Sequence, residues 1–292
     1  MNKGIIVKGI GGFYYVDSGG VITECKARGH FRNKKLSPCV GDRVVFTVGQ
    51  DGKGSIDEIC ERSNIFVRPP VCNIDEMIIV ASVSNPSPDL TFIDKMLVIA
   101  EYSGVGVKIC FNKFDLDDGN VNEIVNMYRN AGYVAFTAST VDNIGIEIIR
   151  NSLRDKITAF SGFSGVGKSS LLNAVTNSYI MPTGEVSERL RRGKHTTRHV
   201  ELISYGGGYI VDTPGFSMLD FPLEITKETL KQYFKEFESF EPECRFRGCN
   251  HMGAASVCRV CKAAENGEIS LSRYNNYKSF YAALSQRKEW EK

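Results

Sequence analysis

The segment "GFSGVGKSS", residues 162 to 170, has the residue types and spacing of a loop that binds phosphate groups. It matches the pattern G-x-x-x-x-G-K-[ST], in which glycines let backbone N–H groups turn towards a phosphate chain. The lysine can reach the β- and γ-phosphates, the hydroxyl after it can ligate Mg²⁺, and the following helix directs its positive end at the anion. We therefore expect a phosphate site made of Gly162, Phe163, Ser164, Gly165, Val166, Gly167, Lys168, Ser169 and Ser170.

A second phosphate-sensing segment, "VDTPG", follows at residues 211–215. Asp212 ends an apolar strand and can hold Mg²⁺ through water, and Gly215 can offer its N–H to a γ-phosphate. Alone, D-x-P-G is a common turn. At the end of a strand that follows a phosphate-binding loop, it indicates a nucleotide switch.

The segment "NKFD", residues 112–115, has the residue types that recognise guanine. The Asp115 carboxylate can accept from both N1–H and the 2-amino group of guanine, whereas adenine has no such pair of donors. "TAS" closes the next strand, where a backbone N–H could meet the guanine O6. With the loop and "DTPG", these motifs specify guanine and argue against an ATPase. The expected base site is Asn112, Lys113, Phe114, Asp115, Thr137, Ala138 and Ser139.

The segment "SERLRRGKHTTRHV", residues 187–200, is basic and is expected to be the first switch. A threonine here, Thr196 or Thr197, could close on Mg²⁺ when GTP is bound. Phe216 follows "DTPG", where many GTPases place a glutamine that orients water, and an apolar side chain cannot do this. We expect slow hydrolysis by the isolated protein, with the missing group supplied by a partner or by His195. The alternative is an exposed basic loop with a solvated histidine.

A cluster of soft ligands, "CRFRGCNHMGAASVCRVC", lies near the C-terminus. Thiolates with one imidazole suit tetrahedral Zn²⁺, and disulfides are disfavoured in a reducing cytosol. Four ligands are needed and five are present: Cys244, Cys249, His251, Cys258 and Cys261. The remaining cysteines are scattered and are expected to be buried thiols; they are Cys25, Cys39, Cys60, Cys72 and Cys110.

The elements that must position these residues divide the chain into three parts. Residues 1–68 contain five short strands separated by turns, which fits a small barrel of the OB type. Their basic loop "KARGHFRNKKLS" could contact RNA or could simply be solvated. Residues 69–222 alternate strands with helices, as in an α/β P-loop GTPase domain. Residues 223–292 have aromatic residues at helical spacing over 225–240 and 269–290, which predicts a helical zinc-binding domain.

Composition supports a cytoplasmic protein without a membrane partner. The chain has 292 residues, of which 42% are hydrophobic, an ordinary value for a folded protein of two or three domains. No stretch approaches the ~20 apolar residues that cross a bilayer, and the N-terminus lacks a signal-peptide pattern. Net charge is +2, with basic excess at both ends and acidic excess in the middle. This suits contact of the ends with a polyanion. We expect a monomer.

The order of the motifs is unusual, because the base-reading segments precede the phosphate-reading ones. The chain resembles the circularly permuted GTPase family of small-ribosomal-subunit assembly, ribosome small subunit-dependent GTPase A. The resemblance covers nearly the full length and rests on "RPPVCNIDEMIIV", "NKFD", "GFSGVGKSSLLN", "GKHTTR", "DTPGF" and the Cys/His cluster, in this order. Because "DTPG" leads within a few residues into the last domain, we also expect the γ-phosphate to move that domain.

The resemblance implies an OB barrel, a permuted GTPase domain and a zinc domain. It implies GTP hydrolysis stimulated by the small ribosomal subunit, contact with its rRNA, and a role in late subunit maturation. It assigns Cys244, Cys249 and His251 to zinc. The family's last ligand usually lies one residue nearer the histidine than Cys258 does. We choose Cys258 as the fourth ligand, and this departure leaves Cys261 as the alternative. The alternative function, which Phe216 keeps open, is a non-hydrolysing RNA-binding scaffold that only senses guanine nucleotide.

Overall fold

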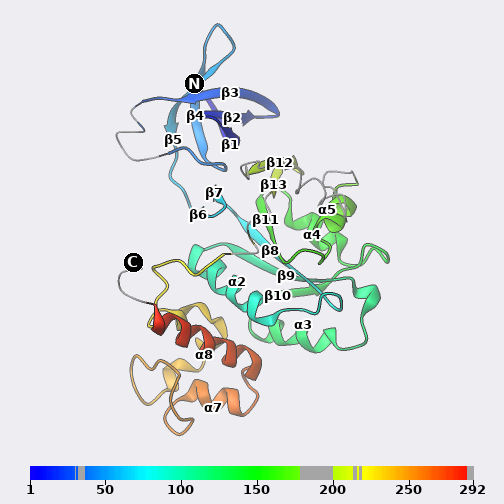
Figure 1. Cartoon of the computed structure of the whole chain (residues 1–292), viewed down its shortest axis with the longest axis vertical. Helices are drawn as coiled ribbons and strands as arrows, with labels where there is room; N and C mark the ends of the chain where they lie inside the picture. The colour runs from blue at the N-terminus through cyan, green and yellow to red at the C-terminus, as the bar shows by residue number, and fades with distance from the viewer. Residues whose placement is uncertain (30, 32–36, 178–199, 213–215, 217–218, 288–292) are drawn as a thin grey trace. The chain divides into compact units, whose positions relative to one another are not determined.

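The computed structural model describes residues 1–29, 31, 37–177, 200–212, 216 and 219–287 of the chain (Figure 1). These residues form two compact units, and each is considered by itself. The first contains Met1–Ile78, Gly145–Phe163 and Lys168–Leu219, and the second contains Ile79–Ile144, Ser164–Gly167 and Asp220–Lys292. The candidate residues His195, Thr196, Thr197 and Gly215, and most of the basic loop after Gly29, lie outside the described residues.

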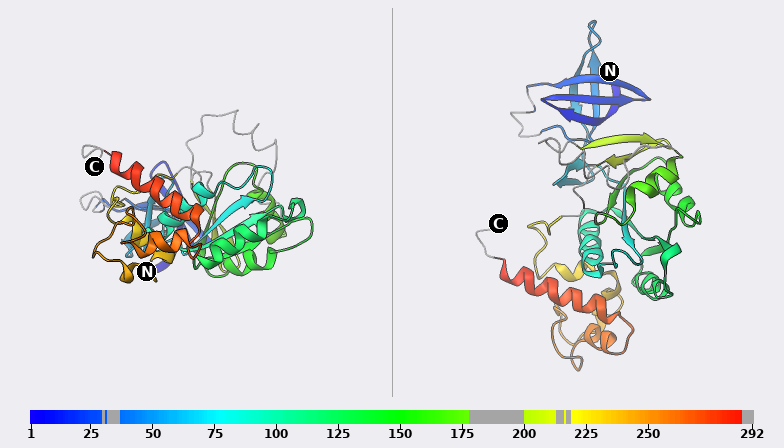
Figure 2. Two further views of the ribbon diagram at one scale, coloured as in Figure 1. Left: turned by 90° about the horizontal axis from the view of Figure 1, so that it is seen from below. Right: turned by 45° about the vertical axis from the view of Figure 1, so that its right-hand side comes forward.

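The first unit begins with the closed barrel of five strands that the sequence predicts. Its strands are β1 (Asn2–Ile10), β2 (Phe13–Ser18), β3 (Val21–Ala27), β4 (Arg43–Val48) and β5 (Gly54–Ile59). β1 pairs with both β2 and β4, and the parallel pair β3–β5 completes the ring (Figure 2). Ile6, Val16 and Ile56 are fully buried, as expected where inward side chains fill a small barrel.

A hairpin and part of an α/β sheet complete the first unit. These elements are β6 (Ile65–Val67), β7 (Pro70–Cys72), α4 (Ile146–Ser152), β11 (Ile157–Ser161), α5 (Lys168–Thr176), β12 (Glu201–Tyr205) and β13 (Gly208–Asp212). β13 runs parallel to β11 and antiparallel to β12. β12 also pairs with the barrel strand β1, at Lys8 and Glu201. The barrel is therefore joined directly to the hairpin that ends in Asp212.

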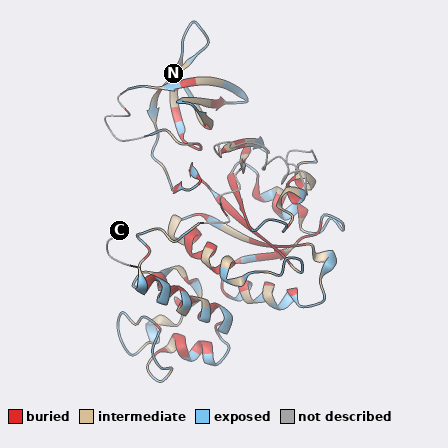
Figure 3. Cartoon of the chain, viewed as in Figure 1, coloured by how far each residue is buried: buried red, intermediate tan, exposed pale blue. Residues whose placement is uncertain are grey.

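Strand β8 (Glu76–Ser82) starts in the first unit and ends in the second, and every one of its residues is buried (Figure 3). This agrees with its near-continuous apolar sequence. The second unit continues with α2 (Leu90–Ser103), β9 (Gly106–Asn112), η1 (Phe114–Leu116), α3 (Val121–Asn130) and β10 (Val134–Thr137). Its strands lie in the order β10-β9-β8, with β9 and β10 parallel. Asp89 caps α2 by accepting from the Phe92 N–H, and Gly104 ends it at a φ of 64°.

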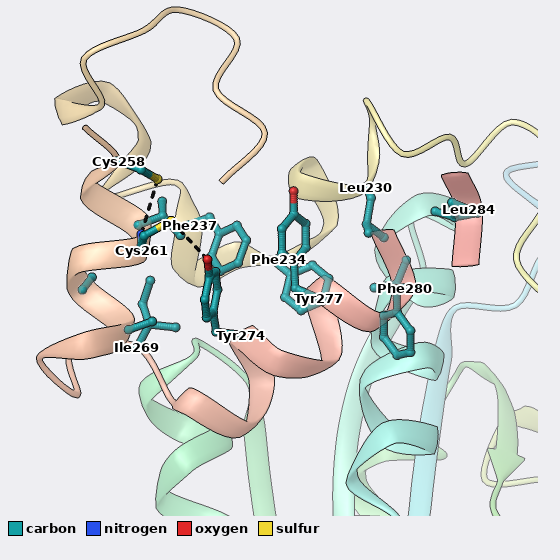
Figure 4. Close-up of a cluster of buried hydrophobic side chains, with 14 of the residues drawn as sticks. Leu230, Phe234, Phe237, Cys258, Cys261, Ile269, Tyr274, Tyr277, Phe280 and Leu284 are labelled. Carbon is teal, nitrogen blue, oxygen red and sulfur yellow. Dashed lines mark hydrogen bonds between the residues drawn. The ribbon is translucent and has the colours of Figure 1, made fainter. Parts of the chain in front are cut away.

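The C-terminal part of the second unit has an aromatic core. Its elements are η3 (Leu230–Tyr233), η4 (Lys235–Phe237), η5 (Glu241–Glu243), α7 (Arg259–Glu265) and α8 (Leu271–Gln286). Phe234, Phe237 and Tyr277 are buried together (Figure 4), with ring centroids 4.9 Å apart for Phe237–Tyr277 and 5.2 Å for Phe234–Phe237. The prediction that these aromatic residues form a core is confirmed.

The spacing of the aromatic residues over 225–240 predicts helical structure, and this segment contains no α-helix. The structure has two short 3-10 segments there, with backbone bonds from Phe237 N to Phe234 O and from Phe240 N to Phe237 O. Phe234 has an extended backbone, with φ of −112° and ψ of 91°, so it ends the first 3-10 segment and precedes the second. The spacing of the aromatic residues does not distinguish such short 3-10 turns from an α-helix.

The cysteines outside the C-terminal cluster differ in exposure. Cys25, Cys72 and Cys110 are buried, Cys39 is half-buried and Cys60 is exposed. The expectation of buried thiols is therefore wrong for Cys60. Within the described part of the chain, no helix is both long enough and apolar enough to cross a membrane.

Candidate nucleotide-binding and metal-binding sites

The segment "NKFD" leaves the end of β9 and turns sharply in the second unit. Lys113 has a left-handed backbone, with a φ of 63°, and its ammonium donates to the Asn85 carbonyl. The Phe114 N–H donates to the Ala138 carbonyl at 3.0 Å, so the turn lies against the end of β10. The two base-reading segments that the sequence predicts, Asn112–Asp115 and Thr137–Ser139, are thus brought together.

Ser139 orients the carboxylate that the sequence assigns to guanine. Its hydroxyl donates to Asp115 Oδ1 at 2.8 Å and accepts from the N–H groups of Val141 and Asp142 at 3.2 and 3.1 Å. Ser139 is fully buried, whereas Asp115 is exposed. The hydroxyl proton is therefore committed to the carboxylate, which leaves the other carboxylate oxygen for a ligand. The sequence predicted a backbone role for "TAS" and missed this side-chain role.

Asn112 connects the base-reading turn to the phosphate-binding loop within the second unit. Its Nδ2 donates to the Val166 carbonyl at 2.9 Å, and its Oδ1 is buried with no hydrogen-bond partner among the described residues. Gly167 has a φ of +93°, and a Cβ there would lie 2.2 Å from Asn112 Nδ2. Only glycine fits this close approach. The glycine of the motif therefore leaves room for the Asn112 amide.

The lysine of the loop lies at the first residue of α5, in the first unit. Lys168 Nζ donates to the carbonyls of Gly162 and Phe163, both at 2.7 Å. Gly162 has a φ of 147°, which lets its backbone turn as the loop begins. Ser169 and Ser170 follow in the first turn of the helix. The Lys168 ammonium, the two serine hydroxyls and the N-terminus of α5 thus lie on one short stretch of the chain, as phosphate binding requires.

Phe216, the residue after "DTPG", is held inside the first unit. Only 1% of its surface is exposed, and its ring meets Phe66 of β6 edge to face with centroids 5.4 Å apart. Its carbonyl accepts from the buried Ser161 hydroxyl at 2.9 Å. The side chain cannot orient a water molecule for attack, as the sequence predicted. Sequence reasoning missed both partners, although a serine that ends an apolar strand signals a buried hydroxyl in need of one.

Four of the five C-terminal ligands come together in the second unit. The ligand atoms of Cys244, Cys249, His251 and Cys258 all lie within 4.8 Å of one another, and the set could hold a metal ion. His251 is fully buried. Burial lowers the pKa of His251, although nearby Glu241 opposes the shift, so the neutral imidazole that binds metals is favoured.

Cys261 is turned to other partners. Its Sγ donates to the His251 carbonyl at 3.4 Å and lies 3.1 Å from the Tyr274 hydroxyl (Figure 4). Tyr274 and Tyr277 of α8 donate to the carbonyls of His251 and Asn250 at 2.8 and 2.5 Å. These bonds fix the ligand loop to α8, a role that the sequence pattern did not reveal.

The fold and the two groups of residues define a P-loop GTPase whose base-reading segment precedes its phosphate-binding loop. The sequence model of the RsgA GTPase matches residues 59–222, and that of the RsgA N-terminal domain matches residues 3–56. The chain therefore belongs to the RsgA GTPase family, and it is a GTP-hydrolysing enzyme.

Similar proteins cover the whole length. The small ribosomal subunit biogenesis GTPases RsgA of Clostridium novyi and Geobacillus thermodenitrificans are each 44% identical to the chain. Both similarities cover 99% of the chain, and they cover 100% of the first relative and 99% of the second. The crystal structure of YloQ, a circularly permuted GTPase, is 35% identical with a TM-score of 0.83, over 99% of this chain and 96% of that one. The crystal structure of YjeQ from Thermotoga maritima is 36% identical with a TM-score of 0.85, over 98% of this chain and 99% of that one.

Proposed function

We propose that this GTPase binds the small ribosomal subunit and acts in its late maturation, with hydrolysis stimulated by the subunit. The bond between Asn112 and Val166 carries the nucleotide assignment, because it ties the base-reading turn to the phosphate-binding loop. The names of the full-length relatives support the subunit as partner. A cytoplasmic monomer that contacts rRNA is consistent with this function.

Each group of residues then has a separate part in binding GTP. Asn112 to Asp115 and Thr137 to Ser139 hold the guanine, and Gly162 to Ser170 hold the phosphates. Mg²⁺ enters with the nucleotide, and Ser169, Asp212 and Thr197 are its proposed protein contacts. Gly215 senses the γ-phosphate. His195 is the candidate for the catalytic group, since buried Phe216 cannot serve.

The direct test measures GTP turnover with and without purified small subunits, using Lys168→Ala as the inactive control. We expect slow turnover alone and faster turnover with subunits, because a partner must position the attacking water. Turnover that subunits leave unchanged would contradict the proposal. A non-hydrolysing scaffold would show no GTP turnover with or without subunits, and membership of a GTPase family disfavours this alternative.

The preference of the site for guanine can be tested separately. Asp115→Asn replaces one carboxylate oxygen with an NH2 group, so a guanine donor faces another donor and loses its partner. A lost hydrogen bond of this kind costs about 1–3 kcal/mol, roughly 5- to 150-fold in GTP affinity. Xanthosine nucleotides, which offer an acceptor there, should bind the variant better than the parent. Equal GTP affinity of the variant and the parent would remove Asp115 from the base site.

We propose that the C-terminal cluster holds one structural Zn²⁺. Tetrahedral zinc with Zn–S of about 2.3 Å and Zn–N of about 2.0–2.1 Å places two sulfurs about 3.8 Å apart and a sulfur and nitrogen about 3.6 Å apart. Cys244 and Cys258 have their Sγ atoms 3.8 Å apart, and His251 Nδ1 lies 3.5 Å from Cys258 Sγ. Glu241 lies 3.8 Å from His251 Nε2, where a carboxylate can orient the ring.

A pair of matched serine variants tests this ligand set. Cys258→Ser should lose the metal and unfold the last segment locally, whereas Cys261→Ser should keep about one Zn²⁺ per chain. Metal analysis with hydrogen exchange of α7 and α8 separates the two cases. Loss of zinc from Cys261→Ser alone would exchange the roles of the two cysteines.

A further inference from the structure

Two cysteines of the first unit, far apart in sequence, share one buried carboxylate. Asp42 is fully buried, and its Oδ2 accepts from the backbone N–H of Cys39 at 2.7 Å. Its Oδ1 accepts from the Cys72 thiol at 3.1 Å. The Cys39 backbone and the Cys72 thiol therefore bind the two oxygens of one carboxylate. Cys72 Sγ also lies 3.4 Å from the carbonyl oxygen of Val40, the residue after Cys39.

The backbone holds the two cysteine segments against each other. The Cys72 N–H donates to the Val40 carbonyl at 2.9 Å, and Val40 forms an isolated bridge with Val71. A Cβ on Gly41, which has a φ of +93°, would lie 2.0 Å from the Cys72 carbonyl oxygen. The barrel segment and β7 are therefore in direct backbone contact, with no room for a side chain on Gly41.

The two thiols differ in access to solvent. Cys39 is half-buried and lines a cavity of about 260 Å³, together with the β1–β2 turn around Gly11 and with Pro70. Cys72 has no exposed surface. A small reagent can therefore reach Cys39, whereas Cys72 is shielded from it.

The groups around the two thiols also favour reaction at Cys39 before Cys72. The hydrogen bond from Cys72 lowers the pKa of Cys39 and Arg62 contributes, although burial and Asp42 oppose this. The hydrogen bond to Cys39, burial and Asp42 raise the pKa of Cys72. Arg62 pairs with Asp42 through Nε and Nη2, at 2.7 and 2.9 Å. The accessible sulfur is therefore the one that ionises, and the thiolate is the reactive form.

We propose that Cys39 and Cys72 are an oxidisable thiol pair, which hydroperoxides convert to a disulfide between the barrel and β7. The Cys39 thiolate attacks a peroxide oxygen, so that an S–O bond forms, the O–O bond breaks and hydroxide or alkoxide leaves. The Cys72 sulfur then attacks the Cys39 sulfur, so that S–S forms and S–O breaks. The Cys72 proton passes by way of Asp42 to the departing hydroxide, which leaves as water. The two sulfurs together lose two electrons to the peroxide.

The cross-link would act on the hairpin that carries Phe66. That hairpin holds Phe66 against Phe216, the residue after "DTPG", within the first unit. Fixing β7 to the barrel would restrain this contact. On the proposed function, oxidation should therefore lower subunit-stimulated GTP turnover, and a thiol reductant should restore it.

Peptide mapping tests the chemistry with hydrogen peroxide as the probe. Trypsin places Cys39 in residues 36–43, Cys60 in residues 54–62 and Cys72 in residues 63–95, because the Arg68–Pro69 bond resists cleavage. We expect peroxide to join the first and third peptides, with loss of two hydrogen atoms, in the parent and in Cys60→Ser. Neither Cys39→Ser nor Cys72→Ser should give this product. A Cys39 peptide that carries only sulfinic or sulfonic acid, with no linked peptide, would overturn the proposal.

Turnover of the same samples separates this inference from the proposed function. Stimulated turnover should fall in the oxidised parent, recover with dithiothreitol, and stay unchanged in peroxide-treated Cys39→Ser, which keeps the same C-terminal cluster. A linked peptide with unchanged turnover would overturn the effect on the hairpin. If the reduced parent shows no stimulation by subunits, the proposed function fails, whatever the peptide map shows.

Discussion

In the first unit, a partly exposed ion pair joins the barrel to the GTPase sheet, whereas in the second unit buried charges join the C-terminal segment to α2. Lys8 and Glu201 join the barrel to β12 at 2.6 Å, with side chains 31% and 46% exposed. Arg273 of α8 reaches Asp94 of α2 and Glu236, with Arg273 only 1% and Asp94 0% exposed. The two attachments therefore differ in how much free energy their loss would cost.

The buried attachment depends on a complete set of charges. Burial alone would lower the pKa of Arg273, but the carboxylates of Asp94 and Glu236 raise it above its ordinary value, so it stays charged. Its guanidinium also lies 5.3 Å from the centroid of the Phe234 ring. Buried charges that lose a partner are costly. We conclude that α2 and the C-terminal segment move together.

The attachment of the barrel involves the strands that lead to the nucleotide. Tyr209 of β13 donates to Asp17 of the barrel at 2.9 Å, and β13 ends in Asp212. Phe216 meets Phe66 of the hairpin that follows the barrel. Asp17, Phe66 and Phe216 are all buried, so a change near the phosphates can reach the barrel through these contacts. The expectation that the γ-phosphate moves the C-terminal domain stays a prediction, because Gly215 lies outside the described residues.

The largest effect is expected at the buried attachment. Arg273→Met keeps most of the volume but leaves Asp94 and Glu236 without a cation, and breaking a buried pair in this way costs about 3–5 kcal/mol. Hydrogen exchange of peptides from α2 and α8 in increasing urea measures the loss locally.

Lys95→Met is the matched control for this change, because it breaks an ion pair on the same helix. Lys95 and Asp220 are 2.8 Å apart, but the Asp220 side chain is 93% exposed. Such a pair contributes about 0–1 kcal/mol. Equal exchange rates in Arg273→Met and Lys95→Met would show that the two attachments do not differ as we argue.

The contrast between the two attachments also shows which features could be predicted from the sequence. The motifs predicted the nucleotide segments, because a loop and its chemistry are encoded within a few adjacent residues. The five barrel strands and most of the GTPase elements followed from local periodicity. The partners of Arg273 and Phe216 could not be predicted, since Asp94 and Phe66 lie far away in sequence and carry no local pattern. The 3-10 turns near Phe237 were missed because the spacing of the aromatic residues alone does not distinguish short 3-10 turns from an α-helix.

A loss of similar size is expected at the hairpin of the first unit. Phe66 is 5% exposed, so Phe66→Ala leaves a cavity beside Phe216 and should destabilise this unit by about 3–5 kcal/mol. Subunit-stimulated turnover should fall as well, because the residue after "DTPG" loses its support. Val67→Ala, at a neighbouring residue that is 79% exposed, should change the free energy of unfolding by less than about 0.5 kcal/mol.

A double-mutant cycle sharpens this result. If Phe66 and Phe216 support each other, the variant with both residues replaced by alanine should lose less stability than the sum of the two single changes. Aromatic pairs typically couple by about 0.5–1.5 kcal/mol. Additive losses would mean that the edge-to-face contact does not link the hairpin to the switch segment.

The smallest effect is expected where the barrel and β12 meet. Lys8→Ala removes a partly exposed ion pair with Glu201, while the backbone pairing of the two strands remains. Exposed pairs contribute about 0.2–1 kcal/mol, and salt weakens them because the Debye length falls to about 3 Å at 1 M. The loss of stability should therefore be small at low salt and close to zero at high salt, in urea unfolding of Lys8→Ala, Glu201→Gln and the double variant. A loss as large as that of Arg273→Met, and independent of salt, would place the barrel among the rigidly attached parts and remove the distinction between the two attachments.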